Sequence, residues 1–541
     1  MTVKIANPMP PWLAAPMLVL GTVLLSALFV PVSAPGLHRV ALDPRPSAEI
    51  LVLVEVLALL ALMGWRLPRL LRWGLGVFLA LLAVFHLAGA VVLSFFERDL
   101  DLYFDLPQIP NLVLLFAEAL GPIKGWLAVA CMTLGVVGLV MAIAILLGSM
   151  ERALAGPYRA PITLAAAGLC LALVPMHLVS TNLSREVAQQ TSSTLRAWRI
   201  MQGEDAAYGA AFAAPPPQAS DLSRLKHRDI YLVFFESYGT ILLDDPRFAP
   251  VITPALAEFE RSATASGYYI ASNRIVSPAF GGGSWLAHGT IASGVKLDPF
   301  LYRLLPRTGR PVLTSYLKAA GYDTMQIMPG LKVPMRDASY WGFDRTIAAS
   351  DLDYNGPAFG WFAIPDQYTL KVALERVDAA PHKPQFTQIV LVSSHTPFAP
   401  LPPYLDDWSD AGSYKNVPPE QWDKIRAAPD WAHLDESYRQ AVIYDLETLA
   451  GWLAQLKGQP LVIILGDHQP PGFVSGAQAP HTVPIHILSR DPDLVLPFAR
   501  LGYVAGIVPP HDGSFPGMED FLPEFLSLFA SGHQLALGGG D

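Results

Sequence analysis

The chain has little cysteine and little charge. Only two of its 541 residues are cysteine, Cys131 and Cys170, and both fall inside long apolar runs. No cysteine follows residue 170, so the C-terminal part can form no disulfide, catalytic thiol or thiolate metal site. Charged residues make up 15% of the chain, against about 25% in typical soluble domains. The shortage of charge is concentrated in the first 180 residues, and the remainder has the composition of a globular protein.

Common nucleotide and nucleic-acid signals are also missing. The formal net charge is −9, and no block of Lys and Arg suggests a nucleic-acid partner. Neither GxGxxG nor GxxxxGK[ST] occurs, which removes the usual dinucleotide and P-loop fingerprints.

Five apolar runs approach the roughly 20 residues that a membrane span needs. They are Trp12–Val32, Ile50–Trp65, Gly74–Phe96, Trp126–Leu147 and Pro161–Leu178. A shorter run, Ile109–Leu120, contains Glu118 and prolines near both ends, and we expect it to lie at the membrane interface or re-enter it. The sequence therefore predicts an N-terminal bundle of about five transmembrane helices.

The first apolar run also resembles a signal peptide, because Val32-Ser33-Ala34 loosely fits a cleavage site. The run is too long for that, and Pro35 would directly follow the cut, so we interpret it as a retained span. Glu55 and His86 are ionisable residues inside the second and third runs. Such residues are candidates for function, but a hydrogen bond within the bundle is the favoured interpretation.

Positive charge in the short loops predicts the orientation. The loops "WRLPRLLRWG" and "SMERALAGPYRA" are basic, whereas "ERDLDLYFD" is acidic, and basic loops stay in the cytoplasm. With Lys4 also inside, five spans place everything after about residue 180 outside. We expect a multi-pass protein of the cell (inner) membrane, with a transmembrane domain at 1–180, a linker at 181–227 and an extracytoplasmic domain at 228–541. Within the linker, Leu183–Ile200 is compatible with a helix, and "AAFAAPPPQAS" is interpreted as a spacer.

The C-terminal part alternates between strands and helices. Strands are predicted by apolar segments such as "DIYLVFFES", "QFTQIVLVSSH", "PLVIILGDH" and "TVPIHILS". Helices are predicted by the amphipathic segments between them. This alternation indicates an α/β domain with a mostly parallel central sheet covered on both faces.

Metal-type ligands follow three of these predicted strands. The first strand ends in Glu236, another in His395, and "VIILGDH" ends in Asp467 and His468. Ligands bind beyond the carboxyl ends of strands in open α/β sheets. Each residue alone is weak evidence, since single histidines at loop starts are usually structural. Their recurrence at strand ends in one domain predicts a metal site.

A glycine-rich turn supplies a hydroxyl. In "SPAFGGGSWLAHGTIASG", the segment Gly281–Gly283 allows a tight turn, and Ser284 opens a helix-like stretch. The N-terminal end of a helix stabilises an alkoxide or a phosphate, although such a serine is often only a cap. Ser284 with Glu236, Asp467 and His468 forms an oxygen and nitrogen ligand set suited to one divalent ion, Zn, Mn or Mg. Thr290 is the alternative nucleophile, but it lies about two turns inside the helix.

His395 and His481 remain for the substrate. Imidazoles at such positions bind substrate oxygens or protonate a leaving group. His481 stands in "APHTVPIH", where a structural role is equally compatible with the sequence.

Together the segments "FFESYG", "GGGS", "SSHTPF" and "GDHQPP", behind membrane spans and a linker, resemble the membrane-anchored phosphotransferases of the alkaline phosphatase/sulfatase superfamily. The nearest similarity is to lipoteichoic acid synthases and to phosphoglycerol transferases of periplasmic glucans, with lipid A phosphoethanolamine transferases as cousins. The resemblance implies metal ligation by Glu236, Ser284, Asp467 and His468, with Ser284 as nucleophile. It also implies substrate binding by His395 and His481, and by Arg336, which stands in "PMRD".

The chain departs from these families in three places. Most members have Thr where Ser284 stands. Lipoteichoic acid synthases carry Trp two residues before the arginine, whereas this chain has Pro334. Phosphoethanolamine transferases typically have several external disulfides, and this external domain can have none. The last difference favours the phosphoglycerol branch.

The expected function is therefore transfer of a phospholipid-derived head group, phosphoglycerol first, to a hydroxyl of a glycan or lipid acceptor. Phosphoethanolamine transfer, a membrane-bound phosphodiesterase and an inactive sulfatase-like sensor remain alternatives. A true sulfatase is disfavoured, because "SWLAH" lacks the Pro and Arg that formylglycine formation requires. A two-metal enzyme is disfavoured because "DQYTL", from Asp366, ends in Leu370 where a histidine would be needed.

Overall fold

The computed structural model describes most of the chain. The residues described are 9–29, 32–33, 41–42, 45–110, 113, 122–156, 160–161, 163–165, 167–168, 179–204, 206–332, 335, 337–360, 363–377, 383–418, 421–422, 429–476 and 479–531. The chain divides into two compact units. Unit 1 comprises Met1–Ser94 and Arg98–Trp198, and unit 2 comprises Phe95–Glu97 and Arg199–Asp541.

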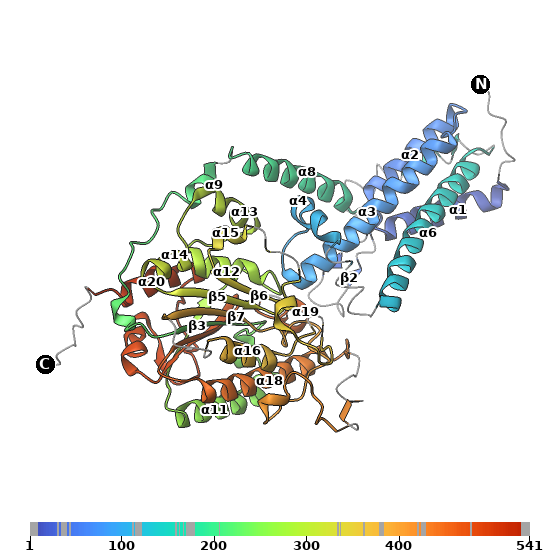
Figure 1. Ribbon diagram of the computed structural model, residues 1–541. Coiled ribbons are helices and arrows are strands. Elements are labelled where there is room, and N and C mark those ends of the chain that lie inside the picture. The colour runs from blue at the N-terminus through green and yellow to red at the C-terminus, as the bar shows by residue number, and fades with distance from the viewer. Residues whose placement is uncertain are drawn as a thin grey trace. The chain divides into compact units, whose positions relative to one another are not determined.

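Unit 1 is helical (Figure 1). Its elements are α1 (Pro11–Ala27), β1 (Val32–Ser33), β2 (Ala41–Leu42), α2 (Ala48–Leu62), α3 (Arg69–Phe96), α4 (Leu102–Asp105), α6 (Pro122–Leu154) and most of α8 (Asn182–Met201). Helices α1 and α2 both pack against α6, and a buried apolar seam that includes Leu18, Leu57 and Leu147 joins them.

Two helices within the described residues, α3 and α6, are long and apolar enough to cross a membrane. The runs predicted as the first two spans fall on α1 and α2, which have only 17 and 15 residues, fewer than the roughly 20 of a full span. Most of the predicted fifth span, Pro161–Leu178, lies outside the described residues, as does most of the run Ile109–Leu120. Membrane-type helices are thus present, and the five-helix bundle stays a prediction.

The two ionisable residues predicted inside spans differ in their contacts. His86 Nδ1 lies 2.6 Å from Glu186 Oε1 of α8, so it makes the side-chain hydrogen bond expected of it. Glu55 is different, because its Oε2 atom is buried and has no hydrogen-bond partner among the described residues.

The predicted linker contains structure. The expected helix at Leu183–Ile200 is confirmed as α8. A second helix, α9 (Ala206–Ala211), follows it, and the segment 206–217 packs on unit 2. There Tyr208 donates a hydrogen bond to Asp298, Arg310 Nη1 donates to the carbonyl of Ala214, and the Tyr316 hydroxyl donates to the carbonyl of Pro217. The segment interpreted as a spacer therefore belongs to unit 2 and is hydrogen-bonded to its helical layer at Ala214 and Pro217.

Unit 2 is a three-layer α/β domain, which confirms the predicted fold class. One eight-stranded sheet has the order β10-β4-β9-β8-β3-β7-β5-β6. Its strands are β3 (Ile230–Phe235), β4 (Tyr269–Val276), β5 (Asp323–Met328), β6 (Arg345–Ala348), β7 (Gln385–Val390), β8 (Leu461–Gly466), β9 (Thr482–Ser489) and β10 (Val504–Ala505). The five neighbours β8, β3, β7, β5 and β6 are parallel to one another, whereas β9 runs antiparallel to both β8 and β4.

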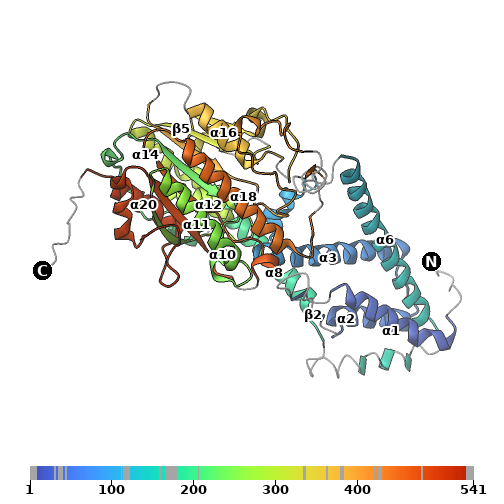
Figure 2. The same ribbon diagram turned by 90° about the horizontal axis from the view of Figure 1, so that it is seen from below.

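Helices cover both faces of this sheet (Figures 1 and 2). One layer contains α11 (Ala249–Ala265), α16 (Asp366–Val377) and α18 (Leu434–Gln455). The other contains α12 (Ser284–Ser293), α14 (Leu313–Ala319) and α20 (Met518–Leu528). Shorter helices complete the unit, namely α10 (Ile241–Asp244), α13 (Pro299–Thr308), α15 (Ala338–Trp341) and α19 (Gly472–Ser475).

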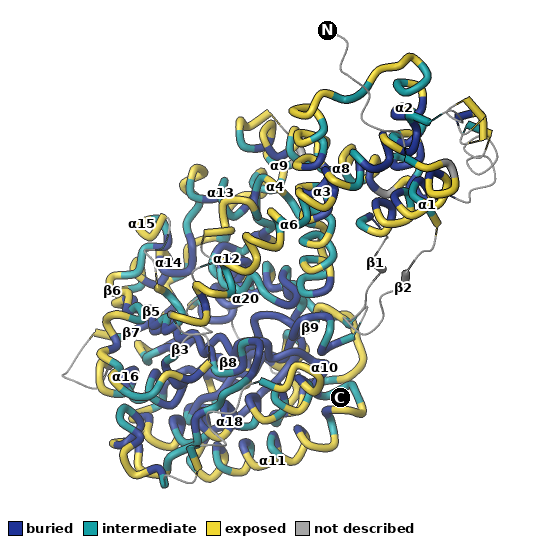
Figure 3. Tube along the Cα trace, turned by 90° about the vertical axis from the view of Figure 1, so that its right-hand side faces the viewer, coloured by how far each residue is buried: buried dark blue, intermediate teal, exposed yellow. Residues whose placement is uncertain are grey.

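Strand β3 shows why the sheet forms here. Its alternate residues enter two different cores: Val233 and Phe235 pack with the α11 and α18 layer, and Leu232 and Phe234 pack with the α12 and α20 layer. A strand buried on both faces needs a continuous apolar sequence, which "IYLVFF" provides. The strands at the centre of the sheet are correspondingly the most buried part of unit 2 (Figure 3).

Candidate metal centre

Three neighbouring parallel strands bring the polar residues together. Phe235, the last residue of β3, pairs with Gly466, the last residue of β8, so the next residues, Glu236 and Asp467, leave the sheet side by side. Gly466 has to be glycine, because a Cβ there would lie 2.0 Å from the carbonyl oxygen of Tyr238. Strand β7, on the other side of β3, leads toward His395.

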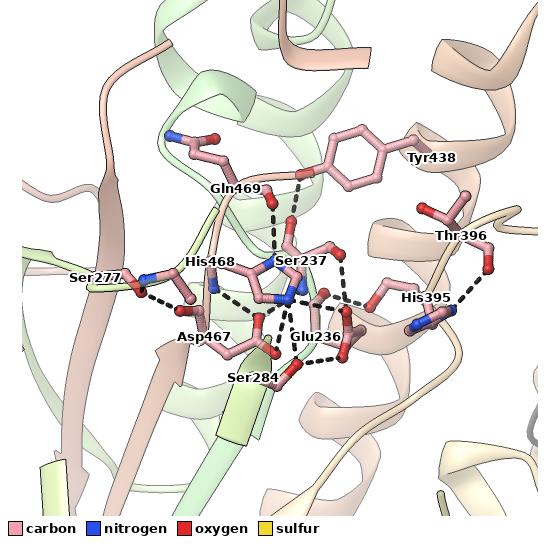
Figure 4. A network of polar contacts seen from close by, with 12 residues as sticks. Glu236, Ser237, Ser277, Ser284, His395, Thr396, Tyr438, Asp467, His468 and Gln469 are labelled. Carbon is pink, nitrogen blue, oxygen red and sulfur yellow. Dashed lines mark hydrogen bonds and ion pairs between the residues drawn. The ribbon is translucent and has the colours of Figure 1, made fainter. Parts of the chain in front are cut away.

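The carboxylates of Glu236 and Asp467 form a compact cluster with the imidazole of His468 (Figure 4). All three residues are buried, and one ligand atom from each lies within 4.8 Å of the other two. The His468 Nε2 atom is 3.5 Å from Glu236 Oε1 and 3.6 Å from Asp467 Oδ2. Its Nδ1 lies 2.8 Å from the carbonyl oxygen of Gln469. A carbonyl only accepts, so Nδ1 carries a proton and Nε2 is the nitrogen that faces the carboxylates.

Ser284 completes the cluster from another element. The residues Gly281, Gly282 and Gly283 have φ angles of 64°, 147° and 81°, a run of left-handed backbone that only glycine adopts readily. This turn ends at the first residue of α12, where Ser284 Oγ lies 3.2 Å from His468 Nε2 and 3.4 Å from Glu236 Oε2. The structure therefore brings together all four residues predicted as metal ligands.

The electrostatics of the cluster fit a bound cation. Asp467 Oδ1 accepts hydrogen bonds from two backbone N–H groups, those of Ser237 and His468. Its Oδ2 atom is buried and has no hydrogen-bond partner among the described residues. Burial raises the pKa of Asp467 to about 6, and the Glu236 carboxylate adds to the effect. Burial lowers the pKa of His468, but the two carboxylates outweigh it and the net shift is upward. A divalent ion on oxygen and nitrogen ligands would satisfy the orphaned oxygen and relieve the repulsion.

Ser237 is a functional residue that sequence reasoning missed. Its hydroxyl donates to Glu236 Oε1 over 3.0 Å, its N–H donates to Asp467, and its carbonyl accepts from the Tyr438 hydroxyl over 2.6 Å. It holds a φ of 55°, which costs a non-glycine residue on the order of 1 kcal/mol. Ser237 therefore fixes both carboxylates. Its position directly after Glu236 in "FFES" was the only signal for it.

The predicted substrate residues fall in different places. His395 lies beside the cluster (Figure 4), and its Nδ1 donates to the Thr396 carbonyl over 2.7 Å. Burial lowers the pKa of His395 to about 4, so the ring is neutral at pH 7. His481 is exposed, with its ring centroid 5.1 Å from that of Phe280, just before the glycine turn. Arg336 lies outside the described residues.

Two further residues of α12 clarify the choice of nucleophile. Thr290 is fully buried, and its Oγ1 accepts a hydrogen bond from the Leu297 N–H. Its hydroxyl has a structural partner and is closed to solvent, whereas Ser284 is partly accessible. His288, one turn after Ser284, was not singled out from the sequence. Its Nε2 is buried without a hydrogen-bond partner among the described residues, and burial lowers its pKa to about 4.

Fold and cluster together define an α/β domain with a candidate metal-binding cluster at the carboxyl ends of its parallel strands. Residues 298–484 match the model of the sulfatase family. This match confirms the resemblance to the alkaline phosphatase/sulfatase superfamily. No curated protein matches the chain.

Solved structures show more distant similarity. The lipooligosaccharide phosphoethanolamine transferase A (EptA) of Neisseria meningitidis, an integral membrane protein, is 14% identical, covers 83% of this chain and 84% of its own, and has a TM-score of 0.43. The lipoteichoic acid synthase LtaP of Listeria monocytogenes is 16% identical over 52% of this chain and 70% of its own, with a TM-score of 0.35. The periplasmic domain of EptC of Escherichia coli, in complex with Zn, is 16% identical over 57% of this chain and 84% of its own, with a TM-score of 0.36. Similarity at this level assigns no head group and no metal to this chain.

Proposed function

We propose that the chain is a membrane-embedded, metal-dependent phosphotransferase. It takes a phosphoryl-linked head group, phosphoglycerol first among the candidates, from a phospholipid and passes it to a hydroxyl of a glycan or lipid. The observation that carries the proposal is the position of Ser284 Oγ within 3.4 Å of both Glu236 Oε2 and His468 Nε2. An accessible hydroxyl beside a buried cluster of metal ligands is the arrangement of an activated nucleophile.

Each group in the site has a defined task. Glu236, Asp467, His468 and Ser284 would hold one divalent ion, Mn, Zn or Mg, which when bound lowers the hydroxyl's pKa and polarises a phosphoryl oxygen. Ser284 Oγ gives up its proton and forms a bond to phosphorus as the bond from phosphorus to the diacylglycerol oxygen breaks, and the leaving oxygen takes up a proton. The free N–H groups at the start of α12 stabilise the phosphoryl charge. An acceptor hydroxyl then attacks phosphorus, loses its proton and releases Ser284.

The substrate histidines fit supporting tasks. His395 is neutral at pH 7 and has its proton on Nδ1, so Nε2 is the nitrogen that accepts a hydrogen bond from a substrate hydroxyl. Arg336 would grip the phosphate bidentately. His481, beside the glycine turn, would contact the outer part of the substrate.

The membrane placement belongs to the same proposal. Helices α3 and α6 are long enough to span a bilayer, and large apolar side chains such as Leu70 and Ile123 stand 86% and 77% exposed on unit 1. Lipid around unit 1 explains that exposure. Five spans, with unit 2 outside the cytoplasm and next to the inner membrane, keep the site at a high effective concentration of its lipid donor.

The decisive experiment measures diacylglycerol release from labelled phospholipid by the purified full chain, with and without hydroxyl acceptors. Ser284→Ala should abolish release because no covalent intermediate forms, and Ser284→Thr should keep appreciable activity. Mass spectrometry of the wild-type Ser284 peptide should detect the adduct and so name the head group. Ser350→Ala, a change of an exposed serine, is the matched control. Undiminished release by Ser284→Ala would end the covalent mechanism.

The same assay separates the alternatives. A transferase releases diacylglycerol faster when an acceptor is present, whereas a phosphodiesterase releases it equally fast in water. Phosphatidylethanolamine as the preferred donor would move the assignment to phosphoethanolamine transfer. A chain that binds metal but cleaves no phospholipid would be the inactive sensor.

Topology is tested by labelling in intact cells. Single cysteines introduced at exposed positions of unit 2, such as Ser409, should react with an impermeant maleimide. A cysteine introduced at Arg69, in the basic loop, should react only after the membrane is permeabilised. Labelling of position 69 in intact cells would show that the orientation is the reverse of the predicted one. Unit 2 would then have no access to lipid donors on the outer side.

A further inference from the structure

A cavity beside the metal centre is used by none of the steps above. It has a volume of about 60 Å³, against the roughly 10–15 Å³ that one water molecule needs. The cavity lies between α12 and the sheet, on the same helix that carries Ser284. His288, one of the lining residues, is four positions after Ser284 and so shares its helix face about 6 Å along the axis.

The walls of the cavity are aromatic. The Trp285 ring meets the Tyr302 ring edge-on with centroids 4.6 Å apart, and the Tyr302 ring stacks on Trp341 at 5.2 Å. Trp285 is 41% exposed and so opens the cavity to the surface, whereas Trp341 is only 6% exposed. Aromatic faces of this kind offer a flat apolar surface to a ligand ring.

The floor of the cavity is polar and uncharged. Gln326 of β5 and Gln388 of β7 are register partners on adjacent parallel strands, so their two amides lie side by side. Gln326 Nε2 donates a hydrogen bond to Thr346 Oγ1 over 2.8 Å. The side-chain oxygen of Gln326 therefore points away from Thr346. None of the described residues that line the cavity is Asp, Glu, Lys or Arg.

Two polar groups in the lining bear on the kind of ligand. The Nε2 of His288 is buried and makes no hydrogen bond among the described residues. The indole N–H of Trp341, which only donates, has the Tyr302 side chain as its one polar neighbour there, so both groups favour a ligand that carries hydroxyl oxygens. A quaternary ammonium group, which aromatic cages also bind, has no acceptor to offer.

From this combination we infer that the cavity is a binding site for one neutral pyranose ring, and that it holds the acceptor glycan next to Ser284. The aromatic walls contact the apolar face of the ring, and the imidazole, indole and amide groups satisfy its hydroxyls. The role of the sugar as acceptor rests on the proposed function, whereas its binding in the cavity does not.

The test uses the full-length Ser284→Ala protein, which cannot turn over. Its binding of the methyl glycosides of glucose, galactose, mannose and N-acetylglucosamine is measured by saturation-transfer NMR titration. At least one glycoside should bind saturably. Adding Trp285→Ala should weaken that binding at least tenfold, and adding Ala292→Met, which fills the cavity from α12, should weaken it to a similar extent. The matched control is Trp431→Ala, because Trp431 is 55% exposed and does not line the cavity.

Three results would overturn the inference. One is that none of the four glycosides binds. Another is that a glycoside binds equally well after both Trp285→Ala and Ala292→Met, with melting temperatures showing that these variants are folded. The third is that choline chloride or inorganic phosphate displaces the sugar from the wild-type cavity more effectively than a second sugar does. Donor cleavage by the wild-type chain is scored separately, so failure of the phosphotransferase proposal leaves the binding result intact.

Discussion

Two buried pairs of carboxyl groups in unit 2 have opposite surroundings. Glu236 and Asp467 lie at the ends of β3 and β8, and Asp366 and Asp445 lie near the end of β7, on α16 and α18. None of the four is more than 5% exposed. The first pair is joined by the imidazole of His468 within 3.6 Å. The second pair, called here the inner pair, gains no third metal-type ligand among the described residues.

The repulsion between two buried carboxylates is relieved differently in the two pairs. Asp366 accepts hydrogen bonds from the N–H groups of Val392 and Ser393 over 2.9 and 2.7 Å. Asp445 lies within hydrogen-bonding reach of the Asp366 carboxyl and the Ser394 hydroxyl, and burial, with the Asp366 carboxylate adding to it, raises the pKa of Asp445 well above its ordinary value. A proton on Asp445 therefore removes one of the two charges of the inner pair, whereas a metal ion is expected to neutralise the other pair. We expect the imidazole of His468 to make the first pair a metal site and the inner pair to be structural.

The largest expected effect is a difference in metal content between a variant of the first pair and a variant of the inner pair. Asp467→Asn should lower the affinity for the divalent ion by at least about 100-fold, because one of four ligands loses its charge. Asp445→Asn should leave metal content unchanged. Elemental analysis of the purified full chain, with Asp512→Asn as the exposed control, gives the answer. A full complement of metal in Asp467→Asn would contradict the ligand assignment.

The next effect is the pH dependence of metal uptake. The pKa of Asp467 is about 6 in the metal-free protein, so below pH 6 protons compete for the carboxylate and metal binding must displace them. The apparent metal affinity should fall at least about tenfold for each pH unit below 6 and level off only above the raised pKa of His468. Metal titrations at pH 5, 6 and 7.5 measure this dependence. A flat profile across that range would mean that Asp467 does not bind the ion.

Sequence reasoning predicted the cluster of Glu236, Asp467 and His468 because these residues follow strand ends. The oily strands "IYLVFF" and "VIILG" stop where Glu236 and Asp467 begin, and parallel strands bring their carboxyl ends to one edge of the sheet. Such patterns are local and can be read directly from the chain. The α/β class of unit 2 and the start of a helix at Ser284 were predictable for the same reason.

The parts that escaped prediction depend on partners far apart in the sequence. Strand β4 contains "SNR", which appears too polar for a buried strand. Ser272 donates to the carbonyl of Gly506, and Arg274 pairs with Asp244 over 2.5 Å, so these two polar side chains bind residues far away in the sequence. The inner pair could not be predicted from the sequence for a similar reason. Asp366 was considered only as part of a metal motif that ends in Leu370, and its partner Asp445 lies in a helix whose pattern is amphipathic.

A smaller effect concerns stability. A carboxyl group whose pKa is higher in the folded chain takes up a proton on folding, so it opposes folding increasingly as the pH rises above its unfolded pKa of about 3.9. Asp445→Asn removes this penalty and its amide can still donate to Asp366. Relative to wild type, the variant should gain about 1 kcal/mol by pH 7.5 and little at pH 4. Melting temperatures measured from pH 4 to 8 should therefore diverge, and parallel curves would show that the inner pair does not hold a proton.

The smallest expected effect tests whether the two pairs are independent. Ser394 is fully buried after β7, and its hydroxyl donates to the backbone carbonyl of Glu236 over 2.7 Å. Ser394→Ala should weaken metal binding less than tenfold, because it loosens the backbone of one ligand without removing the carboxylate. The Ser394 hydroxyl is also within hydrogen-bonding reach of Asp445. If the effect of Ser394→Ala on metal affinity stays unchanged within about 0.5 kcal/mol when Asp445→Asn is added, that contact does not couple the two pairs. Ser350→Ala is the exposed control for the hydroxyl. A change in metal affinity on Asp445→Asn alone, or strong non-additivity with Ser394→Ala, would join the inner pair and the metal ligands into one network. In that case the proton on Asp445 would tune the metal centre, and the contrast between a structural and a reactive pair would no longer hold.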